Sequence, residues 1–106
     1  MINNKQIAEI TKTIVDNYHP EKIILFGSYA NGNFTRDSDL DLLLIKESNL
    51  PRFKRAREVH EFFDPYPIAM DILVYTKREV EKWKNFSHSF INQVFENGII
   101  LYERTC

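Results

Sequence analysis

Three aspartates and a Gly-Ser pair are the residues of this sequence that could carry metal-dependent chemistry. Gly27 and Ser28 end one apolar run, and Asp39 and Asp41 open the next. Residues i and i+2 of a strand share a face, so both carboxylates point the same way, where like charges repel and lose hydration. A divalent cation removes that conflict, and the Ser28 hydroxyl could reach a phosphate that shares the cation. The stretch 25–45 therefore predicts a strand–loop–strand site for a metal-bound nucleotide.

Asp71 is a third acidic residue in an apolar setting, the segment 68–75. Burying a lone ionised carboxylate there would cost several kcal/mol, so we expect it to be neutralised, paired or bound to metal. If its strand lies beside that of Asp39 and Asp41 with the faces aligned, three carboxylates converge on one point. The alternative is a structural salt bridge with an arginine or lysine. Carboxylate oxygens without a His or Cys cluster favour Mg²⁺ or Mn²⁺, and two such ions can polarise the oxygens of a phosphoryl transfer.

Strands alternate with helices along the chain, and these elements must position the acidic residues. Apolar spacing and end signals predict helices over 4–18, 51–63 and 89–96, a helix starting at the capping box 76–79, and a helical turn over 28–31. Strands are expected over 22–26, 40–45, 68–75 and 99–102. The alternation predicts an α/β (α+β) fold with a small mixed sheet flanked by helices, and the length predicts one domain over 1–106.

Helical spacing predicts whether the side chains of two further sets are buried or exposed. The helix 51–63 is expected to bury a stripe of Phe53, Ala56, Val59 and Phe63. Its basic residues are expected on the solvated face, with a docking patch for an acidic partner as the alternative; they are Arg52, Lys54, Arg55 and Arg57. A set of aromatic residues is expected in the core rather than facing a partner; it comprises Trp83, Phe86, Phe90 and Phe95.

Composition excludes several classes of function. Fourteen basic and fifteen acidic residues nearly cancel, so no global field attracts nucleic acid. The sequence has neither a signal peptide nor an apolar run of membrane-spanning length, and we expect a cytoplasmic protein without membrane contact. The single cysteine, Cys106, is expected to be a solvated tail residue.

The combination of Gly27-Ser28, Asp39-Leu40-Asp41 and a later Asp71 resembles the DNA polymerase beta-like nucleotidyltransferase superfamily. More closely, the sequence is similar to the minimal nucleotidyltransferases (MntA-like), the antitoxin half of HEPN/MNT toxin–antitoxin pairs. The likeness runs from the segment K-I-I-L-F-G-S-Y to D-I-L-V-Y-T and beyond. It implies the polymerase beta-like nucleotidyltransferase fold and a protein adenylyltransferase activity.

The resemblance also implies roles for particular residues. Asp39 and Asp41 would ligate two Mg²⁺ ions, and Asp71 would ligate the catalytic ion and help to deprotonate the acceptor. Gly27 and Ser28 would hold the triphosphate of ATP. AMP would pass to a hydroxyl, typically a tyrosine, of the HEPN toxin, which is an RNase. Many relatives carry a basic residue where this chain has Asn31, so a phosphate contact would be weaker here or supplied by Arg36.

Two other functions stay open at this stage. A non-catalytic antitoxin would neutralise the same toxin by contact, with nucleotide as a structural ligand. A small-molecule nucleotidyltransferase of the aminoglycoside type usually needs extra elements to hold its acceptor, so here its site would be completed by another chain. A homodimer or a hetero-oligomer with the toxin is possible, and ATP as the nucleotide follows from the resemblance and not from any residue read in the sequence alone.

Overall fold

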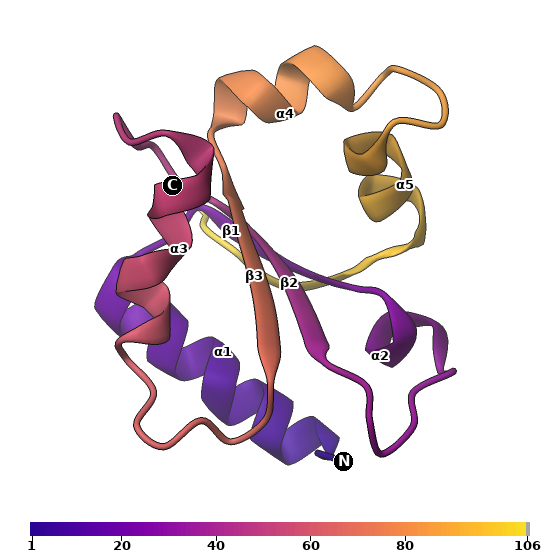
Figure 1. Cartoon of the computed structure of the whole chain (residues 1–106). Helices are drawn as coiled ribbons and strands as arrows, with labels where there is room; N and C mark the ends of the chain where they lie inside the picture. Colours follow the sequence, from indigo (N-terminus) through magenta and orange to yellow (C-terminus); the bar gives the residue numbers. More distant parts are fainter. Residues whose placement is uncertain (106) are drawn as a thin grey trace.

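The computed structural model describes residues 1–105. Cys106 lies outside them. In chain order the elements are α1 (Asn4–Tyr18), β1 (Lys22–Phe26), α2 (Ser28–Asn31), β2 (Leu40–Ile45), α3 (Arg52–His60), β3 (Met70–Tyr75), α4 (Lys77–Trp83), α5 (Phe90–Asn97) and β4 (Ile99–Glu103). Figure 1 shows their arrangement. The predicted alternation of helices and strands is confirmed, and four of the predicted ranges, 4–18, 22–26, 28–31 and 40–45, match to the residue.

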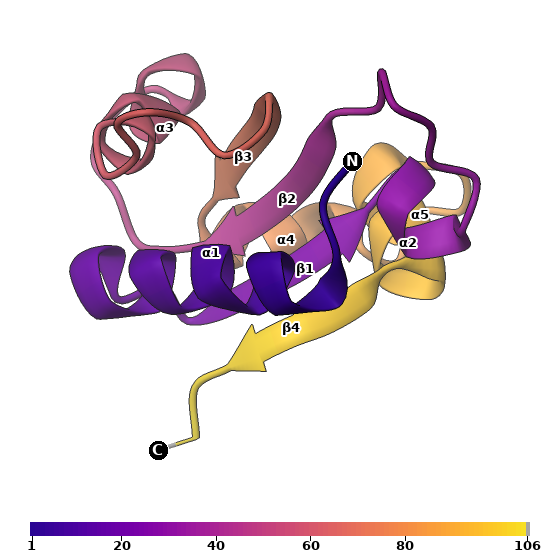
Figure 2. The ribbon, with the colours of Figure 1, turned by 90° about the horizontal axis from the view of Figure 1, so that it is seen from below.

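The four strands form one mixed sheet in the order β3-β2-β1-β4. β1 pairs antiparallel with β2 and with β4, whereas β2 and β3 are parallel. β4 lies at the sheet edge next to β1 (Figure 2). The parallel pair needs the long crossover that contains α3, and this crossover returns the chain to begin β3 beside the start of β2.

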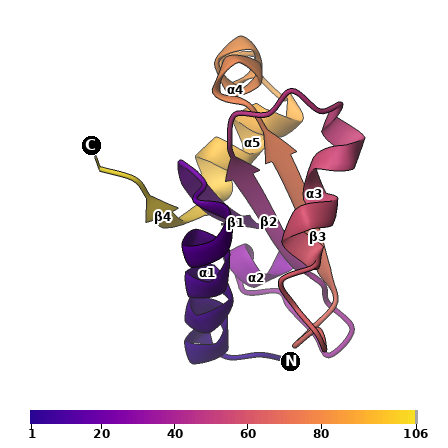
Figure 3. The same cartoon turned by 90° about the vertical axis from the view of Figure 1, so that its left-hand side faces the viewer.

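Helices cover both faces of the sheet, as the sequence predicted. α1 and α3 pack on one face, against the even-numbered residues of β2, while α4 and α5 pack on the other (Figure 3). The first face buries Leu40, Leu42 and Leu44, and the second buries Leu43 and Ile45. Because successive residues of a strand alternate between faces, Asp39 and Asp41 belong to the face of α4 and α5.

The predicted stripe of α3 is wrong at its first residue. Phe53 is 83% exposed, whereas Arg55 is only 7% exposed. The Arg55 guanidinium donates from Nη1 to Glu79 Oε1 at 2.6 Å and to the carbonyl of Val74 at 3.2 Å. Glu79 also caps α4, since it accepts the Thr76 N–H. Arg55 therefore joins α3 to β3 and α4, and it is not part of a solvated basic face.

The predicted burial of the aromatic set is wrong for its first three members. Trp83, Phe86 and Phe90 are exposed, and Phe95 alone among them is partly buried. α4 ends at Trp83, and the turn that follows carries Phe86 to the surface before α5 begins. Among residues 1–105, no helix is both long and apolar enough to cross a membrane.

Candidate active site

The site is organised by the pairing of Asp41 with Asp71. These residues are register partners across the parallel strands β2 and β3. They share the sheet face that carries Leu43 and Leu73, as the aligned strands of the sequence prediction require. Asp39 is exposed and lies two residues before Asp41, just outside β2. The starts of two neighbouring strands therefore bring acidic residues from distant parts of the sequence to one edge of the sheet.

The ionised form of the Asp41 carboxyl is disfavoured at this site. Its pKa is raised from 3.8 to about 6, first by burial and then by the negative charges of Asp71 and Asp39. The expectation that Asp71 is the buried acid is wrong, because Asp71 is exposed where β3 opens to solvent. Among residues 1–105, Asp71 forms no ion pair, so the alternative of a structural salt bridge is not seen.

The donor set fits a hard divalent cation, although the side chains are not gathered around one point. Within residues 1–105, no three His, Cys, Asp or Glu side chains are clustered closely enough to hold a metal ion. The full convergence expected for Asp39, Asp41 and Asp71 is therefore absent from this arrangement. What the site offers is carboxylate oxygens with uncompensated negative charge, as the raised pKa of Asp41 reports. Oxygen donors of this kind suit Mg²⁺ or Mn²⁺.

Gly27 is the residue that lets the Asp41 carboxylate lie against the end of β1. It sits at φ 74° and ψ −154°, a conformation that L residues rarely adopt. A Cβ placed on Gly27 would overlap Oδ2 of Asp41 and would lie 3.1 Å from its Cγ. The sequence motif assigns this glycine to phosphate contact, and the structure adds that a larger residue would displace the Asp41 side chain.

Ser28 begins the short helix α2 directly after Gly27 and is half-buried. Gly32 ends α2 at φ 83°, which confirms the predicted helical turn and its end. The Gly-Ser pair thus lies at the end of β1, and Phe26, the residue before it, is the register partner of Asp41. This proximity is what the sequence prediction needs for a phosphate shared between Ser28 and the carboxylates.

The two candidates for an additional phosphate contact are both exposed. Asn31 closes α2, and its Oδ1 accepts the N–H of Asn33 at 3.0 Å. Arg36 lies in the following loop. Tyr29 points to the other side: it stacks on Phe34 with ring centroids 4.6 Å apart, and its hydroxyl accepts the N–H of Ile2. Tyr29 therefore fills space under the loop.

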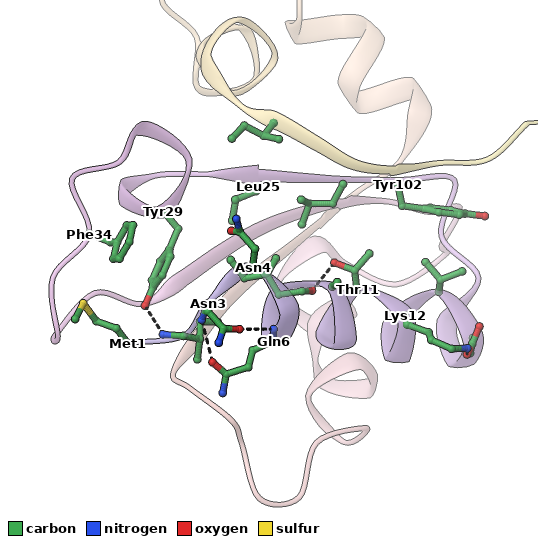
Figure 4. A pocket seen from close by; sticks show the side chains of 17 residues that line it. Met1, Asn3, Asn4, Gln6, Thr11, Lys12, Leu25, Tyr29, Phe34 and Tyr102 are labelled. Atoms are coloured by element: carbon green, nitrogen blue, oxygen red, sulfur yellow. Dashed lines mark hydrogen bonds and ion pairs between the residues drawn. The ribbon is translucent and has the colours of Figure 1, made fainter.

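Two hollows lie near these elements. The larger, about 1050 Å³, is a groove between α1 and β4 on the opposite side from the carboxylates, with Leu25, Tyr29 and Phe34 in its wall (Figure 4). The smaller, about 270 Å³, lies between α2 and α5 beside Gly27. Sequence reasoning missed the α5 contribution to this hollow. The signal was the set of residues at 90, 93 and 97, which recur at helical spacing.

Comparisons with known proteins show the family of this chain. The family model for "Polymerase beta, Nucleotidyltransferase" matches residues 8–105. The chain is 33% identical over 96 residues to the "Putative protein adenylyltransferase MJ0141" of Methanocaldococcus jannaschii, covering 90% of this chain and 87% of that protein. It is 30% identical over 105 residues to MJ0604 of the same organism, a protein of the same description, covering 96% of this chain and all of that one.

A solved structure shares the fold. The crystal structure of a toxin–antitoxin with AMP-PNP superimposes with a TM-score of 0.65 at 24% identity, over 97% of this chain and 76% of that one. The chain therefore belongs to the polymerase beta nucleotidyltransferase family, and it is a nucleotidyltransferase.

Proposed function

We propose that this protein transfers AMP from ATP to a hydroxyl of a partner protein in a Mg²⁺-dependent reaction. The acceptor is a tyrosine of a HEPN-family toxin, so the protein acts as the cytoplasmic antitoxin of that toxin. The observation that carries the proposal is the pairing of Asp41 with Asp71 on one sheet face, beside the Gly27-Ser28 turn. The description of the relatives as protein adenylyltransferases and the AMP-PNP of the similar toxin–antitoxin structure support the acceptor class and the nucleotide.

The carboxylates have two roles, which are to bind the metal ions and to accept the proton of the acceptor hydroxyl. Asp39, Asp41 and Asp71 would hold two Mg²⁺ ions, or Mn²⁺ in their place. Bound there, the ions supply charge neutralisation and polarisation of the phosphate oxygens. Asp71 is exposed, so it can also accept the proton of an incoming hydroxyl. Asp41 is partly buried, and its carboxylate lies against Gly27 at the end of β1.

The Gly27-Ser28 turn would bind the triphosphate. Backbone N–H groups at the start of α2 and the Ser28 hydroxyl are the donors available there, and Arg36 is the proposed cation. In the reaction the acceptor oxygen forms a bond to the α-phosphorus, and the bond between the α-phosphorus and the bridging oxygen breaks. The leaving group is pyrophosphate, and the acceptor's proton passes to Asp71.

The test uses ATP labelled at its α-phosphate, Mg²⁺ and the protein encoded by the neighbouring gene. We expect label on that protein with the wild type and none with Asp39→Asn or Asp41→Asn. Asp37→Asn is the matched control, because Asp37 is an exposed aspartate of the same loop. Label that persists in the Asp41→Asn reaction, or that disappears equally with Asp37→Asn, would refute the assignment of the carboxylates.

A non-catalytic antitoxin is the second candidate. It is favoured by one observation, the exposure of the aromatic residues Trp83, Phe86 and Phe90, which could bind a partner directly. In the same experiment, inhibition of the toxin without any transferred label would identify this function instead of catalysis.

A further inference from the structure

The hollow between α2 and α5 has the properties of a site for a neutral, flat ring. It is lined by Phe26, Gly27, Ala30, Asn31, Phe90, Gln93, Val94, Asn97 and Gly98. None of these side chains is charged. Its volume of about 270 Å³ lies just below the usual range of pockets for drug-sized ligands, so it would hold a ring system and not a whole nucleoside triphosphate. The phosphates of a nucleotide would remain outside.

The position of this hollow links it to the acidic residues. Residues of both α2 and α5 line the hollow, and so do Phe26, where β1 ends, and Gly27. Gly27 belongs both to the wall of the hollow and to the turn proposed to bind phosphate. Phe26, the next lining residue, is the register partner of Asp41. A ligand could therefore have its ring between α2 and α5 and its phosphates beside the carboxylates.

Two aromatic rings form one side of the hollow. Phe26 and Phe90 meet edge to face, with ring centroids 5.4 Å apart and planes at 83°. Phe90 remains 42% exposed despite this contact and a second one with Tyr75 at 6.3 Å. An exposed aromatic face beside a cavity is a surface on which a base can stack.

Side-chain amides supply the polar groups. Among residues 1–105, the side-chain amide of Asn97 makes no hydrogen bond, so both its amino group and its carbonyl oxygen are available. Gln93 donates to the carbonyl of His88 at 3.1 Å, which leaves its own oxygen available. Asn31 accepts through Oδ1, which leaves its amino group available. An amide can donate to one ring nitrogen and accept from an exocyclic amino group, and this is how Asn and Gln recognise adenine.

The wall that carries Gln93 and Asn97 packs against β1. α5 ends at Gly98, whose N–H donates to the carbonyl of Val94 at 2.8 Å. A Cβ on Gly98 would lie 2.6 Å from Cγ2 of Ile24 and 2.5 Å from the Val94 carbonyl, so the end of α5 rests directly on β1. The side chains of α5 therefore face the hollow from a fixed backbone.

We infer that the hollow between α2 and α5 binds the adenine ring of the nucleotide and selects ATP among nucleoside triphosphates. This inference rests on the proposed function and deepens it by assigning residues to base recognition. Phe90 provides the stacking surface, and Asn97, with Gln93 and Asn31, reads the edge of the base. The larger groove between α1 and β4 is the competing location, but it lies on the other side of the sheet from Asp41.

The first test locates the base without phosphate or metal. Adenosine is titrated into the isotope-labelled full chain, and the backbone amide signals are followed by NMR. We expect the signals of Phe90, Gln93 and Asn97 to move, and uridine at the same concentration to move them far less. Shifts confined to Tyr29 and Tyr102 in the groove between α1 and β4, or no shifts at all, would overturn the inference.

The second test measures the affinities for ATP, CTP and tripolyphosphate in Mg²⁺. Phe90→Ala and Asn97→Ala should each weaken ATP binding by roughly tenfold and reduce the preference for ATP over CTP, while tripolyphosphate binding is unchanged. Phe53→Ala and Asn49→Ala are the matched controls, since both residues are exposed and neither lines the hollow. Asn97 lies in the last turn of α5 and its side chain forms no hydrogen bond within the part of the chain that the structure describes, so its variant tests the site even where loss of Phe90 disturbs folding.

The outcomes separate this inference from the proposed function. An unchanged preference for ATP in both variants, with AMP transfer to the partner intact, refutes the adenine site alone. Adenosine binding at Phe90 and Asn97 in a protein that transfers no label refutes the proposed function and supports the adenine site.

Discussion

Replacing Gly27 by alanine tests how the Asp41 carboxylate is held at the site. The backbone at φ 74° and ψ −154° costs an L residue about 1–3 kcal/mol. In addition, the new Cβ would overlap Asp41 Oδ2, and its 3.1 Å separation from Cγ is already shorter than an ordinary contact. The Asp41 side chain must therefore rotate away, and we expect nucleotidyl transfer to fall to the level of Asp41→Asn.

Gly32→Ala is the matched control for the backbone contribution. Gly32 also has a positive φ, 83°, but no atom lies within 4 Å of a Cβ built there. Its replacement should cost about 1–2 kcal/mol of unfolding free energy through the left-handed conformation alone. Because the Asp41 side chain is not disturbed, the rate of AMP transfer should stay at the wild-type level.

Urea denaturation of the metal-free proteins and the label-transfer assay provide the two readouts. Asp41→Ala removes the overlapping carboxylate, so Gly27→Ala should cost less unfolding free energy in the Asp41→Ala background than in the wild type. The reasoning is refuted if Gly27→Ala costs no more stability than Gly32→Ala and transfers AMP at the wild-type rate.

Three further predictions concern charged residues. The folded-state pKa of Asp41, about 6, lies above its ordinary value of 3.8, so the folded chain binds more protons than the unfolded chain between these values and loses stability as pH rises through them. The stability gain of metal-free Asp41→Asn over wild type should therefore grow between pH 4 and 6 in urea titrations, and a constant difference would contradict this. Asp71→Asn should abolish transfer but leave the metal-free melting temperature unchanged or raised, and a sharp drop by calorimetry would point to a missed structural ion pair. Arg55→Ala should lower the unfolding free energy by about 3 kcal/mol because it removes the cationic partner of Glu79 and a donor to the Val74 carbonyl, while exposed Arg57→Ala should change it by less than about 0.5 kcal/mol.

The parts of the fold that sequence predicted well are those governed by local signals. The helix 4–18 repeats its apolar residues at helical spacing and starts at the Asn3 cap, and Thr76 and Glu79 form the expected capping box. Because successive side chains of a strand point to opposite faces of the sheet, the strand predicted over 40–45 puts Asp41 on the face opposite Leu42. The alignment of Asp71 with Asp41 was predicted only as a condition, because strand order and register arise from tertiary packing.

The errors arose where burial depends on partners elsewhere in the chain. The apolar Phe53 was expected inside and the charged Arg55 outside, but the position of α3 against β3 turns Arg55 toward Glu79. The exposure of Asp71 likewise reflects its place at the open start of an edge strand. The hollow between α2 and α5 joins residues more than fifty positions apart, so the helical spacing within α5 indicates one of its walls but not the α2 wall that faces it.

Binding of Mn²⁺ in the presence of ATP, followed by electron paramagnetic resonance, tests the central claim most directly. If Asp41 and Asp71 hold the ion that accompanies the nucleotide, the wild type and Asp37→Asn will bind Mn²⁺ in an ATP-dependent manner, whereas Asp41→Asn and Asp71→Asn will not. Wild-type Mn²⁺ affinity in both of these variants would contradict the claim that the paired strand starts form the active site.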